Sequence, residues 1–188
     1  MRGAVDQEAE QQWIRQAQAG DRKAFAALVD LYWPRINRWL YGLTGNTHVS
    51  EDLTQDVFLK AWTALPKFEG TFGFRAWLFR IASNSLIDSR RGPRGAKADP
   101  LPDSLASHEP GPVATILSQE SQTMVQEACS RLPSKLKTAF LLRTQEEMSF
   151  EEIGQVLGVT EETVRWRVFK ARHELLNELK NYLDGKSG

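Results

Sequence analysis

Residues Ser149 to Leu176, SFEEIGQVLGVTEETVRWRVFKARHELL, decide the fold of this chain. Ser149 is followed three residues later by Glu152, a capping-box pair that predicts the start of a helix at Ser149. Gly158 permits a tight exit from that helix, and Thr160 is suited to cap a second helix. Two short helices joined by a brief turn that contains glycine are typical of a helix-turn-helix.

The second helix of the pair is predicted to present a basic surface. Val164 and Val168 form its inner stripe. Its outward positions carry four cations: Arg165, Arg167, Lys170 and Arg172. Such a helix can lie in the major groove of DNA, where cations meet phosphates and base edges. The alternative is an ordinary helical hairpin with a solvated basic face, but the order of caps, glycine and cations favours DNA binding.

Charge is segregated along the chain. The 188 residues allow one medium domain or two small ones, and 24 basic residues balance 24 acidic ones. A protein that coats DNA passively is normally basic overall, so here the charges have to be read locally. Residues 75–97 hold six cations against Asp88 alone, whereas residues 98–127 hold five carboxylates and no Lys or Arg.

The chemistry-bearing residue types argue against an enzyme. Cys129 is the single cysteine, so it forms no internal disulfide, and we expect it to be a buried, inert thiol in a reducing compartment. The three histidines lie far apart in sequence, and no Gly-rich phosphate loop is present. We therefore expect no catalysis, no cofactor and no metal. No segment approaches membrane-spanning length, which favours a cytoplasmic protein without membrane insertion of its own.

Apolar spacings of three and four recur throughout and predict an all-α fold. Two small helical domains are expected, residues 1–91 and 113–188, joined by a flexible, acidic linker at 92–112 that holds five prolines and three glycines. The expected helices are Gln7–Ala19, a second from Asp21 to Gly45 that is bent or interrupted at Pro34, Val49–Leu65, Phe74–Arg91, Val113–Ser130, Pro133–Glu147, and the helix-turn-helix pair ending near Leu183.

Two blocks of residues resemble one family. Residues 51–62 (EDLTQDVFLKAW), 68–70 (FEG) and 74–84 (FRAWLFRIASN) resemble conserved region 2 of the extracytoplasmic-function sigma factors of bacterial RNA polymerase. Residues 132–172 resemble region 4 of the same family. Both blocks occur in the right order and at the right separation, so the resemblance is more specific than a lone helix-turn-helix.

The resemblance implies a sigma factor with no catalysis of its own. Such a protein directs core RNA polymerase to promoters, recognises the minus-thirty-five and minus-ten elements, and melts the promoter. The implied partners are core RNA polymerase (the clamp helices of its largest subunit and the flap of its second-largest), promoter DNA and an anti-sigma factor. A stand-alone helix-turn-helix regulator would leave the first domain unexplained. A mimic that only titrates an anti-sigma factor would have no need of the DNA-binding residues described next.

The resemblance assigns the third expected helix to core polymerase. Its docking residues would be Asp52, Gln55, Asp56 and Leu59. Acidic and amide groups suit a basic partner surface, where charges tune encounter and register. The alternative is a solvated helix face.

A loop and the basic, aromatic helix after it are assigned to the minus-ten element. The residues concerned are Phe68, Phe72, Arg75, Trp77, Arg80, Asn84, Arg90 and Arg91. Single-stranded DNA is held by stacking on aromatic faces and by cations along the backbone. A flipped base would sit near Phe68, and Asn84 would offer its amide to base or backbone. Trp77 also fits the core stripe of its helix, so packing is an alternative to stacking.

The recognition helix is assigned to the minus-thirty-five element. Its contact residues would be Thr163, Arg165, Trp166, Arg167, Phe169 and Lys170. Trp166 departs from the family pattern, in which a small polar residue is usual. It either reads DNA or folds against the helix-turn-helix core. The acidic linker would thread toward the polymerase active centre, or it is an ordinary spacer.

Overall fold

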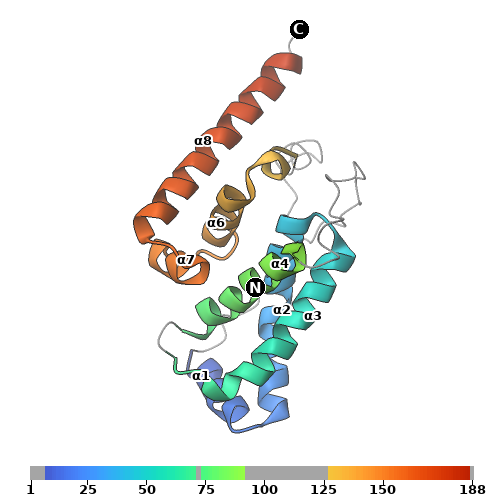
Figure 1. Ribbon diagram of the computed structural model, residues 1–188, viewed down its shortest axis with the longest axis vertical. Helices are drawn as coiled ribbons and strands as arrows, with labels where there is room; N and C mark the ends of the chain where they lie inside the picture. Colours follow the sequence, from blue (N-terminus) through green and yellow to red (C-terminus); the bar gives the residue numbers. More distant parts are fainter. Residues whose placement is uncertain (1–6, 71–72, 92–126, 187–188) are drawn as a thin grey trace. The chain divides into compact units, whose positions relative to one another are not determined.

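The computed structural model describes residues 7–70, 73–91 and 127–186, and every regular element within them is a helix (Figure 1). The chain forms two compact units: one contains α1 to α4, and the other contains α6, α8 and most of α7. The expected all-α architecture with two helical domains is confirmed. The expected linker at 92–112 lies outside the described residues, so the domain boundaries stay a prediction.

The first unit is a bundle of four helices in chain order. α2 packs on α1 and α3, and α3 packs on α4. The elements are α1 (Gln7–Gln18), α2 (Arg22–Thr44), α3 (Thr47–Ala64), the short 3-10 helix η1 (Leu65–Lys67) and α4 (Phe74–Arg91).

Local capping sets the junctions of this bundle. The Asp21 carboxylate accepts hydrogen bonds from the backbone N–H groups of Lys23 and Ala24, at 2.8 and 3.3 Å, and so begins α2. Gly45 ends α2 at φ +66°, in the left-handed region that glycine adopts without penalty. The Asn46 side chain accepts from the Val49 N–H at 3.0 Å and begins α3.

A bend or an interruption was expected at Pro34, and the interruption does not occur, because α2 continues through this residue. A proline in a helix interior removes one hydrogen bond and costs about 3 kcal/mol. Residues on both sides of Pro34 are buried, among them Leu28, Tyr32, Ile36 and Trp39. Each large apolar side chain contributes about 1.5–3 kcal/mol when buried. The burial on either side therefore outweighs the local cost of the proline.

Buried apolar residues of three helices form the core of the first unit. It includes Leu28, Ile36, Trp39 and Leu40 of α2, Leu53, Val57 and Ala61 of α3, and Leu78, Phe79 and Ala82 of α4. Phe25 of α2 is only half-buried and packs against Trp62 with ring centroids 4.8 Å apart. Near the end of α4, Leu86 is buried in the core, whereas Ile87 is 43% exposed.

A hydrogen bond from the buried Tyr32 of α2 connects α1 to the rest of the bundle. The Tyr32 hydroxyl donates to the Glu10 carboxylate at 2.7 Å, and its ring lies 5.5 Å from that of Phe74. Burial raises the pKa of Tyr32 well above its usual value, and the acceptor Glu10 raises it further. The phenol therefore stays protonated and keeps donating to Glu10 at any pH near neutrality.

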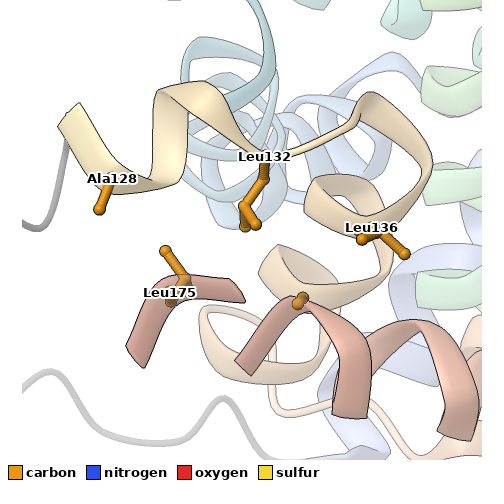
Figure 2. Packing of buried hydrophobic residues seen from close by; sticks show 5 residues of the cluster. Ala128, Leu132, Leu136 and Leu175 are labelled. Atoms are coloured by element: carbon orange, nitrogen blue, oxygen red, sulfur yellow. The ribbon is translucent and has the colours of Figure 1, made fainter. Parts of the chain in front are cut away.

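The described part of the second unit contains a helical stretch at residues 127–131, then α6 (Ser134–Thr144), most of α7 (Phe150–Leu157) and α8 (Glu161–Lys186). One of its core clusters joins three of these segments. Its members are Ala128, Leu132, Leu136, Ala171 and Leu175. Figure 2 shows Ala128 and Leu132 directed toward Leu175 of α8. Contacts far apart in the sequence therefore hold α8 against the start of the unit.

Cys129 lies beside this cluster and is half-buried, whereas full burial was expected. Its burial raises the pKa of the thiol, and the nearby Lys137 acts weakly in the opposite direction. A raised pKa keeps the thiol protonated and poorly nucleophilic near neutral pH. The expectation of an unreactive thiol is thus supported by its surroundings.

The elements of the second unit differ slightly from the expected ranges. α6 ends at Thr144, not at Glu147, and Glu147 adopts a left-handed conformation with φ +53°. α8 extends to Lys186, beyond the expected end near Leu183.

The capping box at the start of α7 is confirmed. The Glu152 N–H donates to the Ser149 hydroxyl at 3.1 Å, and the Ser149 N–H donates to the Glu152 carboxylate at 2.7 Å. Gly158 ends the helix at φ +64°. Thr160 then caps α8, since its hydroxyl accepts from the Thr163 N–H at 3.3 Å. α7, the turn at Gly158 and α8 therefore form the predicted helix-turn-helix.

Gly154 controls how closely the two helices of this motif approach. Its carbonyl accepts the Val159 N–H at 3.0 Å, and a Cβ atom at Gly154 would lie 2.8 Å from the Val159 carbonyl oxygen. That separation is shorter than a carbon and an oxygen tolerate, and neither backbone can rotate away. Only glycine fits this crossing.

We expect Gly154→Ala to destabilise the second unit by about 1–3 kcal/mol, because overpacking outweighs the better helix propensity of alanine. Chemical denaturation of the full chain, followed by circular dichroism, measures the change. Glu151→Ala, at an exposed position of the same helix, is the control and should change stability by less than about 0.5 kcal/mol. A Gly154→Ala variant as stable as the parent chain would contradict the close crossing.

Candidate nucleic-acid interface

An aromatic cluster joins the end of η1 to the start of α4. It consists of Phe68, Phe74 and Trp77, and the ring centroids are 5.8 Å apart for Phe68–Phe74, 4.8 Å for Phe68–Trp77 and 5.4 Å for Phe74–Trp77. Phe74 is buried, whereas Phe68 and Trp77 remain partly exposed. Trp77 therefore does pack, as one alternative held, and it also keeps an open surface. Stacking of Trp77 on a base stays a prediction.

Backbone contacts hold Phe68 at the edge of this cluster. The Phe68 N–H donates to the Leu65 carbonyl at 3.0 Å, and the Phe68 carbonyl accepts from the Gln18 side chain at 2.7 Å. Gly70 and Gly73 have φ values of +75° and +69°, which turn the chain from η1 into α4. Phe72 lies between them, outside the described residues.

The helix α4 carries the polar residues predicted for this site. Trp77, Arg80 and Asn84 follow one another at helical spacing and share one face, and Arg80 and Asn84 are exposed. Arg75 is half-buried, and the Arg90 guanidinium donates to the Leu43 carbonyl at 3.4 Å. The Arg91 side chain lies outside the described residues. An aromatic cluster followed by a cation and an amide on one helix face has the chemistry to hold single-stranded nucleic acid.

A second surface lies on α3. Its exposed residues are Asp52, Gln55, Asp56 and Leu59, and Leu59 is 61% exposed. Leu53 and Val57 face the core, so the rotation of α3 presents the four residues to solvent. Asp56 also lies 3.7 Å from Lys60, whose ammonium donates to the Ser85 hydroxyl of α4 at 2.9 Å. This polar face with an exposed leucine is suited to another protein.

The third surface is the first half of α8. Val164 and Val168 are buried, and Trp166 and Phe169 are 59% and 69% exposed. Since most of its indole lies in solvent, Trp166 is not a core residue, and the alternative that it folds against the helix-turn-helix core is wrong. Thr163, Arg167 and Lys170 are partly exposed on the same helix.

Arg165 is held in place by two neighbours. Its Nε lies 3.1 Å from the Glu161 carboxylate, one helical turn earlier, and its Cζ lies 4.6 Å from the centroid of the Phe150 ring. A cation over an aromatic ring is attracted by the negative face of that ring. The spacing of Glu161 and Arg165, four residues apart on one helix, is a sequence signal for this ion pair. Nothing in the sequence pointed to Phe150.

Residues 7–70, 73–91 and 127–186 hold no group of three or more His, Cys, Asp or Glu side chains that could bind a metal ion. Within the same residues no helix has both the length and the apolar character needed to cross a membrane.

Comparison with known proteins identifies both regions. Residues 28–95 match the family model of Sigma-70 region 2, and residues 122–175 match that of Sigma-70, region 4. The chain is 30% identical to the ECF RNA polymerase sigma factor SigW of Bacillus subtilis, over 89% of this chain and 95% of that protein. It is 32% identical to the RNA polymerase sigma-H factor of Pseudomonas aeruginosa, over 95% of this chain and 98% of that protein.

A solved structure supports the same relationship. The sigma factor RpoE of Bartonella quintana, solved in complex with the anti-sigma factor NepR, has a TM-score of 0.70 and 28% sequence identity, over 84% of this chain and 98% of that one. With both sigma regions present in order and relatives of 30% identity or more along nearly their whole length, the chain belongs to the ECF sigma factors of RNA polymerase, which direct the initiation of transcription at promoters.

Proposed function

We propose that this sigma factor reads the minus-thirty-five element with α8 and captures the melted minus-ten element beside the aromatic cluster of Phe68, Phe74 and Trp77. The observation that carries the proposal is the exposure of Trp166 and Phe169 among the cations of α8. A protein rarely leaves large aromatic side chains together in solvent unless they meet a partner. Cations beside them make nucleic acid the partner that fits best.

On α8, the contacts divide by chemistry. Arg165 has the planar donor fork that recognises guanine edges in the major groove. Lys170 is a point charge suited to phosphate, and it now lies 3.7 Å from Glu174. Trp166 and Phe169 are apolar, so they suit sugar faces and thymine methyl groups. Thr163 and Arg167 border this surface.

Beside the aromatic cluster, the contacts suit single strands. Phe68 and Trp77 offer partly exposed rings on which an unpaired base can stack. Asn84 can both donate to and accept from a base edge, while Arg80 neutralises the backbone. Arg75 and Arg90, with Phe72 and Arg91, would extend the same track.

Docking on core polymerase is assigned to α3. Its exposed carboxylates, Asp52 and Asp56, suit a basic partner such as the clamp helices of the largest subunit, and Leu59 adds an apolar contact. The second unit would bind the flap of the second-largest subunit. Core polymerase would then fix the spacing of the two DNA-binding surfaces.

Further features follow from membership of the family. We propose that the chain catalyses no reaction itself, binds no cofactor and acts in the cytoplasm with RNA polymerase. The Bartonella quintana relative was solved with an anti-sigma factor, and we propose that a protein of that class also binds this chain.

Run-off transcription with purified core polymerase tests the proposal directly. The chain plus core should give transcripts from a subset of candidate promoters, and core alone should give none from the same templates. A chain that binds core polymerase but starts transcription at no promoter would contradict the proposal and favour the mimic.

We expect Asp52→Arg together with Asp56→Arg to weaken core binding about tenfold or more, because two exposed carboxylates become cations facing a basic surface. Titration of labelled chain with core polymerase measures the loss, and circular dichroism checks that helical content is kept. Asp30→Arg, at an exposed position of α2, makes the same change of charge elsewhere and is the control. Unchanged affinity of the double variant would contradict docking through α3.

We expect the two DNA surfaces to fail in different ways. Phe68→Ala and Asn84→Ala should impair promoter opening and leave upstream binding in place. Arg165→Ala should lose about 1–3 kcal/mol at the minus-thirty-five element. Lys170→Ala should weaken all sequences alike and flatten the salt dependence, if it meets only phosphate. Permanganate footprinting measures promoter opening, and binding titrations at several salt concentrations measure DNA affinity. If all four variants lost opening and affinity to the same extent, the proposed division between the two surfaces would be contradicted.

We expect Trp166→Ser to change promoter preference and leave stability within about 0.5 kcal/mol, because the side chain is largely exposed. Thermal unfolding gives the stability, and binding to a set of single-base promoter variants gives the preference. Leu176→Ser, at a position 61% exposed on the same helix, is the matched control. If stability fell and promoter preference did not change, Trp166 would be a packing residue and not a DNA contact.

A further inference from the structure

The side chain of Gln18 makes a contact that no feature of the two sigma regions explains. It lies at the last residue of α1, and its amide donates to the Phe68 carbonyl at 2.7 Å and approaches the Leu65 carbonyl at 3.4 Å. The bond to Phe68 spans 50 residues of sequence. Gln18 lies outside residues 28–95, which match region 2.

The contact lies where the backbone leaves η1. Phe68 caps that short helix in an extended conformation, with φ −74° and ψ +116°, so its carbonyl no longer points along a helix. Carbonyls at helix ends lack intrahelical donors and need other partners. Gln18 supplies one, and the half-buried setting of both residues makes the bond stronger than it would be in water.

Fixing this carbonyl fixes the ring attached to the same residue. The Phe68 ring can lie 4.8 Å from Trp77 and 5.8 Å from Phe74 only while its backbone stays in this place. The residues that follow, Glu69 and Gly70, are exposed and offer no core contact to hold the loop. Besides the bond of the Phe68 N–H to Leu65 and the contacts of its ring, the start of this loop is therefore anchored from α1.

We propose that Gln18 is a positioning residue for capture of single-stranded promoter DNA: its amide holds the Phe68 backbone so that the ring is ready to receive an unpaired base. The inference rests on the proposed role of Phe68. A preorganised ring avoids the cost of ordering a loop when DNA binds, so loss of the anchor weakens DNA binding without removing any DNA contact.

The test uses the complex of the full chain with core polymerase and a fluorescent single-stranded oligonucleotide carrying the minus-ten element of an active promoter. Gln18→Met keeps the length of the side chain and removes the donor. Gln18→Glu replaces the donor by a carboxylate. Gln12→Met and Gln12→Glu make the same changes at an exposed position of α1 and are the matched controls.

Both Gln18 variants should bind the oligonucleotide about five- to tenfold more weakly, the effect of one lost hydrogen bond plus loop ordering. Their affinity for core polymerase should match that of the Gln12 controls. In a Phe68→Ala background, Gln18→Met should cause no further loss, since the ring that it positions is absent.

Three outcomes overturn the inference. Oligonucleotide affinity equal to that of the controls shows that the anchor is dispensable. An equal loss from Gln18→Met with and without Phe68 shows that the residue acts by another route, such as general stability. If Phe68→Ala itself leaves oligonucleotide binding unchanged, the proposed role of Phe68 fails first, and the inference about Gln18 falls with it.

Discussion

Burial of one apolar stripe on each helix is the constraint on which the functional surfaces depend. In α8, Val164 and Val168 are fully or almost fully buried, which fixes the rotation of the helix about its axis. Side chains project at about 100° intervals around a helix, so a fixed inner stripe decides which residues face out. Trp166 and Phe169 are exposed for this reason, and α3 obeys the same rule with Leu53 and Val57 inside and Leu59 outside.

The two proposed DNA-binding surfaces differ in how they are built. α8 presents its aromatic residues on a regular helix, where the backbone needs no support from elsewhere. The aromatic cluster instead joins a short 3-10 helix, two glycines at positive φ and the first turns of α4. A rigid helix suits the regular groove of duplex DNA, whereas an open ring beside a loop suits bases that have left the stack.

Charged residues are also arranged by their neighbours. Arg165 is paired with Glu161 and lies over Phe150, and Lys170 and Lys60 are each close to a carboxylate one turn away. Such exposed pairs contribute little to stability, about 0–1 kcal/mol each. They do hold long side chains near one geometry, and in the proposed complex of α8 with DNA a phosphate can replace the carboxylate at little cost. The zero net charge of the chain is therefore compatible with local DNA binding.

The sequence by itself determined the helices, their caps and the outward face of α8, because each depends on residues at most one or two turns apart. The capping box of Ser149 and Glu152 begins α7, and Gly158 and Gly45 end α7 and α2. Only the tertiary structure decided that α2 continues through Pro34, that Phe150 lies against Arg165, and that Gln18 holds Phe68. These outcomes depend on burial and on partners brought together by packing, and no spacing along the chain encodes them.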